Sequence, residues 1–162
     1  IITAFLLIKY WSANNNLFQT INNIENRKNF RFFYFGTISA IFLIAHSIFL
    51  GIHFENDLYK FFRRFVLLGF ILFELAAQTL LIMQLLKVKK LISNNINNNI
   101  LTLKIILVSL LVIVALLSVP ILITSGHVHF KHMLEWNYFI GILIFYLLTF
   151  LFWRKNKTQV HG

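Results

Sequence analysis

The chain has 162 residues, of which 59% are hydrophobic and 12% charged, with a mean hydropathy of +0.77 and a formal net charge of +10. A water-soluble domain of this length cannot bury so large an apolar fraction, so the composition excludes the soluble classes and predicts an integral membrane protein. The chain contains no cysteine, which excludes disulfides, thiolate metal sites and cysteine nucleophiles.

Four apolar runs are long enough to cross about 30 Å of hydrocarbon as helices. They cover residues 33–53, 65–86, 105–124 and 134–153. A fifth run, residues 1–11, is too short to cross alone and is either the remainder of a truncated helix or an interfacial segment. None of the runs alternates with period two as a barrel strand would. We therefore expect an all-α, polytopic transmembrane bundle of five spans that forms a single domain over residues 1–162.

A polar segment separates the first two runs. Within it, Leu17, Ile21 and Ile24 recur at helical spacing, and asparagine and charged residues fill the other positions. This pattern fits a short amphipathic helix on the membrane surface, and it equally fits an Asn-rich linker. The segment "SNNINNN", residues 93–99, is of low complexity and predicts a loop.

The lysines and arginines predict which way the chain is inserted, because cytoplasmic loops retain positive charge. With five spans, eleven of the fifteen basic residues fall on one side of the membrane and four on the other. The C-terminus is therefore predicted to be cytoplasmic. The charge is explained by this topology and by attraction to the lipid bilayer, so we expect no nucleic acid partner.

The same topology places most of the histidines toward the outer side of the membrane. His53 lies at the end of the run 33–53, while His127, His129 and His132 lie in the loop after the run 105–124. His46 lies on the helix that leads to His53.

These histidines suggest a metal or haem site, since neutral imidazole is a common ligand and His132 with Glu135 can present two ligands on one helical face. In a b-type haem site, His46 and His132 would be the axial ligands. In a transition-metal site, His127, His129, His132 and Glu135 would dominate. The alternatives are a polar site of another kind and solvated histidines with no joint role.

Glu74 lies near the middle of the run 65–86, with Gln78 one helical turn further along. A carboxylate at that depth costs several kcal/mol unless it is paired, solvated or protonated, so Glu74 needs a partner. We expect either a contact with His46, in a proton-transfer or ligand-binding pocket, or a protonated Glu74 bonded to a backbone or hydroxyl group that holds helices in register.

The last run opens with an aromatic and polar cluster. Trp136 and Tyr138 are the residue types found in the aromatic belt of a membrane interface, and we assign them to anchoring. Anchoring does not explain Glu135 or Asn137, which we expect to join the polar pocket.

The sequence thus predicts a multi-pass integral membrane protein with an outer His/Glu pocket that binds a metal or b-type haem. It would serve as a component of a membrane redox or other assembly, with further membrane subunits as partners. The alternatives are a proton-coupled transporter or lipid-modifying enzyme that uses Glu74, and a purely structural subunit.

Overall fold

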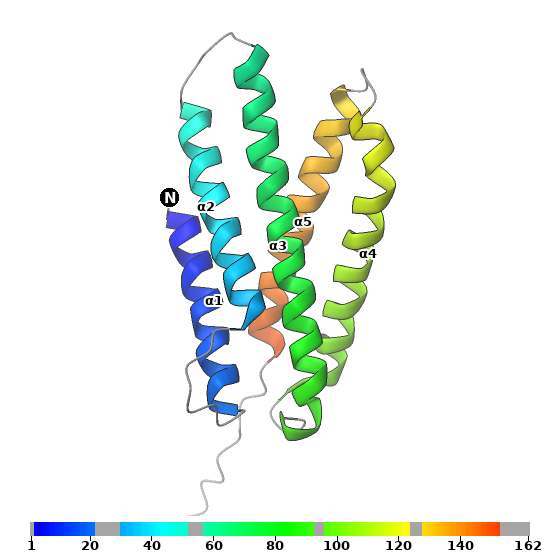
Figure 1. Cartoon of the computed structure of the whole chain (residues 1–162). Coiled ribbons are helices and arrows are strands. Elements are labelled where there is room, and N and C mark those ends of the chain that lie inside the picture. The colour runs from blue at the N-terminus through cyan, green and yellow to red at the C-terminus, as the bar shows by residue number, and fades with distance from the viewer. Residues whose placement is uncertain (1, 22–29, 52–56, 93–95, 124–127, 153–162) are drawn as a thin grey trace, which may run out of the picture. The chain divides into compact units, whose positions relative to one another are not determined.

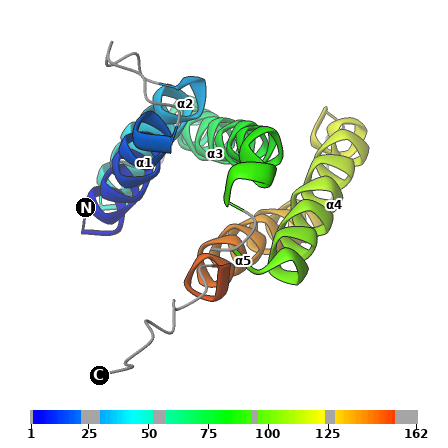
Figure 2. The same cartoon turned by 90° about the horizontal axis from the view of Figure 1, so that it is seen from below.

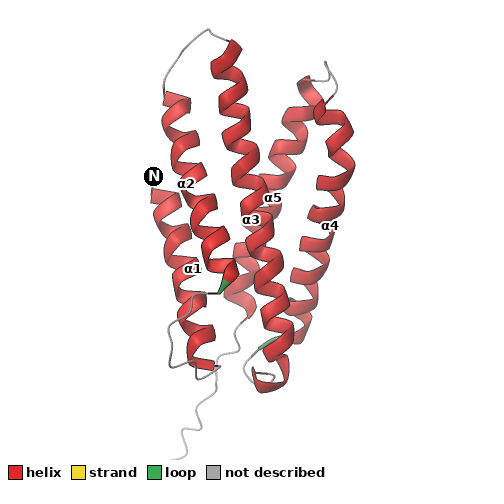
Figure 3. Cartoon of the chain, in the orientation of Figure 1, coloured by secondary structure: helices red, strands yellow, loops and turns green. Residues whose placement is uncertain are grey.

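The computed structural model describes residues 2–21, 30–51, 57–92, 96–123 and 128–152. All regular elements in these ranges are α-helices (Figure 3). They are α1 (Ile2–Ile21), α2 (Arg31–Gly51), α3 (Asp57–Ile92), α4 (Asn98–Ile123) and α5 (Val128–Phe152), as labelled in Figure 1. The all-helical fold predicted from the sequence is confirmed.

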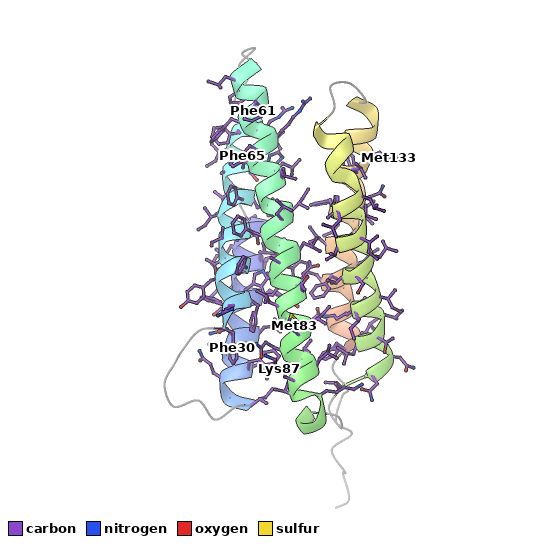
Figure 4. The ribbon with its side chains drawn as sticks, turned by 45° about the vertical axis from the view of Figure 1, so that its right-hand side comes forward. Phe30, Phe61, Phe65, Met83, Lys87 and Met133 are labelled. Atoms are coloured by element: carbon purple, nitrogen blue, oxygen red, sulfur yellow. The ribbon has the colours of Figure 1, made fainter. Side chains whose placement is uncertain are left out.

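Three stretches are both long and apolar enough to cross a membrane. They are Arg31–Gly51, Phe61–Lys89 and Asn98–Leu117, while α5 contributes the shorter apolar stretch Trp136–Thr149. Their outward-facing side chains are largely apolar, as lipid contact requires. Figure 4 shows Phe61, Phe65 and Met83 projecting from α3, and their side chains are 68%, 55% and 50% exposed.

The chain divides into two compact units, Ile1–Leu81 and Ile82–Gly162, with the boundary inside α3. In the first unit, α1 and α2 lie side by side, as Figures 1 and 2 both show. The buried face of α1 carries Ala4, Leu7, Trp11, Asn15 and Phe18. These residues are spaced by three or four, so they form one stripe along the helix.

The continuous stripe corrects the prediction for the polar segment after Trp11. Residues 12–21 form neither a separate surface helix nor a linker, because α1 continues without a break to Ile21. Asn15, only 3% exposed, extends the buried stripe, and its Oδ1 accepts a 2.9 Å hydrogen bond from the Phe30 backbone N–H. This bond satisfies an amide at the start of α2, as a capping residue does. The predicted Ile24 lies outside the described residues.

In the second unit, α4 and α5 lie side by side (Figures 1 and 2). The start of α4 is capped by Asn97, whose Oδ1 accepts a 3.1 Å bond from the Asn99 N–H. The Asn97 N–H in turn donates to the Phe152 carbonyl at 2.9 Å, which ties the start of α4 to the end of α5. Gly141 allows close packing further along, since a Cβ there would lie 2.6 Å from Leu111.

Candidate polar site at Glu74

Glu74 lies in α3, near the middle of the stretch Phe61–Lys89 that is apolar enough to span a membrane. Its side chain is fully buried, with 0% exposure. At 1.5 Å rise per residue, the carboxyl group is about 20 Å from either end of that stretch. Any polar partner of Glu74 must therefore come from a neighbouring helix or from its own.

The structure supplies both kinds of partner. Ser39 on α2 places its Oγ 2.7 Å from Glu74 Oε2, and Gln78, one turn along α3, donates from Nε2 to Glu74 Oε1 at 3.1 Å. The Ser39 Oγ also lies 2.8 Å from the Gly36 carbonyl oxygen. Ser39 and Gln78 are as completely buried as Glu74 itself. We call Glu74, Ser39, Gln78 and the Gly36 carbonyl the Glu74 cluster.

Aromatic rings pack beside the cluster on the same two helices. Phe73, the neighbour of Glu74, lies 5.8 Å from the Phe35 ring and stacks on Phe42 at 5.5 Å. Phe35 and Phe42 lie on either side of Ser39 along α2. Gly69 permits this approach, because a Cβ there would lie 2.8 Å from Phe42. Such packing lowers the local dielectric and strengthens the polar contacts that it surrounds.

A residue of α1, Trp11, packs against α2 at Gly36, next to the Glu74 cluster. The ring of Trp11 is fully buried and lies directly on Gly36, so close that a Cβ at position 36 would overlap the indole. Gly36 thus has two roles: its missing side chain makes room for Trp11, and its carbonyl oxygen accepts from Ser39.

One polar atom of the cluster accepts no hydrogen bond from the residues that the structure describes. Among the residues that the structure describes, Gln78 Oε1 is buried and accepts no hydrogen bond. A buried carbonyl oxygen without a donor costs about 1–3 kcal/mol, so its retention beside a carboxyl group calls for a chemical explanation.

His46 lies on α2 seven residues after Ser39, half-buried. Seven residues correspond to about two turns, or roughly 10 Å along the axis. On α2, Ser39 is a hydrogen-bond partner of Glu74, and it lies at a different level from His46. This matches the hydroxyl bond that the sequence left open for Glu74.

The predicted metal or haem site remains a prediction. His53 and His127 lie outside the described residues, as do the side chains of His129, His132 and Glu135 in α5. Within the described part of the chain, no group of three histidine, aspartate or glutamate side chains is positioned to hold a metal ion.

The two residues assigned to membrane anchoring differ in exposure. Trp136 is 66% exposed and lies edge-on to Phe139 at 6.4 Å. Tyr138 is only 6% exposed, because it falls seven residues before Phe145 on the buried face of α5. Their anchoring role remains a prediction. Asn137 is exposed.

A second buried polar group, Lys104, was not predicted from the sequence, because it falls one residue before the predicted run 105–124. The side chain is 1% exposed on α4, and its Nζ donates to Thr149 Oγ1 at 2.8 Å. The same Nζ lies over the rings of Phe145 and Phe152, at 4.3 and 5.3 Å. Aromatic faces attract an ammonium group, so these contacts offset part of the cost of burying it. Through these contacts Lys104 links α4 to α5.

A signal for Lys104 was present in the spacing. Leu101, Lys104, Val108 and Leu111 follow one another at intervals of three, four and three residues, and all four are buried. This is the period of a single helix face, so Lys104 occupies a core position rather than the edge of a loop.

Comparisons with known proteins give no relative. No family model, no curated protein and no solved structure matches the chain.

Proposed function

We propose that this protein is a multi-pass membrane protein that binds and releases a proton at Glu74, as the coupling step in transport of a small solute. The observation that carries this proposal is the pair of short contacts made by Ser39 Oγ, one to Glu74 and one to Gly36. An ionisable side chain deep in a membrane is functional by default, because it is costly to keep there.

A count of hydrogens supports a neutral Glu74. The Ser39 hydroxyl has one hydrogen, yet two acceptor oxygens lie within hydrogen-bonding distance of it, at 2.7 and 2.8 Å. With Glu74 ionised, one of these contacts has no hydrogen. With a proton on Glu74 Oε2, the acid donates to Ser39 and Ser39 donates to Gly36, so each contact has a hydrogen of its own.

The same count describes what happens when the proton leaves. The Ser39 hydroxyl must then turn from Gly36 to the carboxylate, which needs a donor more than a carbonyl does. Gln78 keeps its donation to the other carboxylate oxygen. The charged form therefore retains two hydrogen bonds, which lowers the cost of releasing the proton inside the membrane.

We further propose that all five helices cross the membrane, with the C-terminus in the cytoplasm. The lengths of α1 and α5 support this, since 20 and 25 residues correspond to about 30 and 38 Å of helix. The distribution of basic residues supports the orientation.

Infrared spectroscopy of the purified protein tests the proton-binding role. We expect a carbonyl stretching band from a protonated carboxyl group that disappears as the pH rises, and that is missing in Glu74→Gln but present in Glu135→Gln. The chain has only five acidic residues, so this difference is readily assigned. A Glu74 band that persists at every pH up to unfolding would show a permanent structural lock and contradict the proposal.

A further inference from the structure

The Glu74 cluster is unusual in being built almost wholly from oxygen atoms. Glu74 offers two carboxylate oxygens, Ser39 a hydroxyl oxygen and Gly36 a main-chain carbonyl oxygen, all joined by contacts of 2.7 and 2.8 Å. Gln78 adds the amide oxygen that has no donor among the described residues. Hard cations without a preference for nitrogen or sulfur take ligands of these kinds.

We propose that the Glu74 cluster binds a sodium ion in exchange for the Glu74 proton. This inference rests on the proposed proton-binding function and names the ion that competes with the proton. In the exchange, the O–H bond of the carboxyl group breaks, the proton leaves, and Na⁺ takes its place among the oxygens. The charge of the cluster is zero both before and after the exchange.

Charge balance selects a monovalent ion. The cluster has one ionisable group, Glu74, and its other oxygens are neutral. A divalent cation would leave one positive charge uncompensated in a buried site at the level of the hydrocarbon, which is strongly unfavourable. One carboxylate with one monovalent ion avoids that cost.

Gln78 gains a role from the exchange. In the protonated form its Nε2 donates to Glu74 at 3.1 Å, and its Oε1 has no donor. A half-turn of the amide about its terminal bond swaps the two atoms and directs Oε1 to the carboxylate. A cation between them then coordinates both oxygens, which satisfies the atom that the proton leaves unsatisfied.

The spacing of the oxygens favours a small ion. Ca²⁺, which has nearly the radius of Na⁺, takes oxygens at about 2.3–2.6 Å, so ligands at right angles are about 3.3–3.7 Å apart. The oxygen–oxygen contacts of 2.7 and 2.8 Å in the cluster must therefore widen by roughly 0.5–1 Å to admit Na⁺. The larger K⁺ ion requires more expansion against the packed Phe35, Phe42 and Phe73 rings.

Among the described residues of the first unit, the lysine and arginine side chains of α1 and α2 are exposed. Lys9 on α1 lies over the Phe5 ring, and Arg31 lies in the first turn of α2. His46 lies about two turns beyond Ser39 on α2, and Arg64 on α3 lies about 15 Å along the helix from Glu74. Glu74 is the one buried carboxyl group among the described side chains, so the exchange is assigned to it.

Thermal unfolding of the full chain in lipid nanodiscs tests the proposal. NaCl is titrated against choline chloride at constant ionic strength and fixed pH, with a parallel KCl series. We expect Na⁺ to raise the unfolding temperature more than K⁺ or choline does. Because one proton leaves for each ion bound, the half-saturating Na⁺ concentration should rise about tenfold for each pH unit of acidification while the site is protonated.

Variants locate the site. We expect Glu74→Gln and Ser39→Ala to lose the sodium-specific shift. Ser47→Ala is the matched control, because Ser47 is an exposed α2 serine that makes the same kind of back-bond, to Leu43 O at 2.9 Å. Equilibrium dialysis of the wild-type protein with radioactive sodium gives an independent measure if a variant does not fold.

A shift that survives in both Glu74→Gln and Ser39→Ala places the ion elsewhere and overturns the inference. It is also overturned if the wild type shows neither a sodium-specific shift nor bound sodium at any pH. In that case, an infrared band of Glu74 that still titrates leaves the proton-binding function standing. A band that never titrates removes both proposals together.

Discussion

Replacing Gly36 by alanine gives the most direct test of the packing around the Glu74 cluster. Alanine is the better helix former, which favours the variant by about 1 kcal/mol. Its Cβ, however, would overlap three atoms of the Trp11 ring, and that ring is fully buried. Overpacking costs about 1–3 kcal/mol, and a rigid indole without free space belongs at the upper end. We expect a net loss of about 2 kcal/mol in the free energy of unfolding.

Gly51→Ala is the control on the same helix, because a Cβ at position 51 meets no atom within 4 Å. Unfolding in mixed micelles, followed by far-ultraviolet circular dichroism, compares the two variants. Adding Trp11→Leu to Gly36→Ala should recover part of the loss, with a coupling energy of about 1 kcal/mol. If Gly36→Ala proves as stable as Gly51→Ala, the contact between α1 and α2 is not as tight as described, and the reasoning fails.

Three further predictions concern capping, the buried lysine and topology. In the same unfolding assay, Asn15→Ala should lower the free energy of unfolding by about 1 kcal/mol, because the Phe30 N–H at the start of α2 loses its acceptor. The control Asn16→Ala, at an exposed position, should have little effect. Equal losses in the two variants would show that Asn15 does not act as a cap. Thr149→Val should cost about 1.5–3 kcal/mol, because the ammonium of Lys104 loses its hydrogen-bond acceptor, and adding Lys104→Met should restore stability; a double variant no better than the single one would refute this account. A single cysteine placed in residues 153–162 of this cysteine-free chain should resist a membrane-impermeant maleimide added outside intact cells, and rapid labelling there would reverse the predicted orientation.

The all-helical fold was predictable from the sequence, because the chain consists mainly of apolar runs that are long enough to span a membrane as helices and lack the alternation of barrel strands. The sequence also predicted that Glu74 needs a polar partner, because it lies deep in an apolar run. It did not predict that Ser39 is that partner. Three hydroxyl residues, Thr37, Ser39 and Ser47, lie in the same run, and the packing of the helices decides which of them faces α3.

The structural roles of three other residues were not predicted, because the composition of their segments suggested exposed loops or surface positions. Asn15 falls in a segment predicted to be a surface helix or a linker, and Asn97 in one predicted to be a loop, yet each caps a helix. Lys104 falls just outside the predicted run 105–124, although its spacing places it on a buried face. Periodicity was the more informative property at these positions, because burial follows the face of a helix rather than its average polarity.

The length of α3 has a mechanical consequence. Its 36 residues make a rod of about 54 Å, which exceeds the hydrocarbon thickness of about 30 Å. Cationic side chains flank both ends, with Arg64 near one and Lys87 and Lys89 near the other. A piston-like displacement in either direction would drag such a charge toward lipid, at about 2.5–3.5 kcal/mol for each one at the bilayer centre. These flanking charges therefore oppose displacement of α3 along the membrane normal, which would keep the carboxyl group of Glu74 at a constant depth in the bilayer.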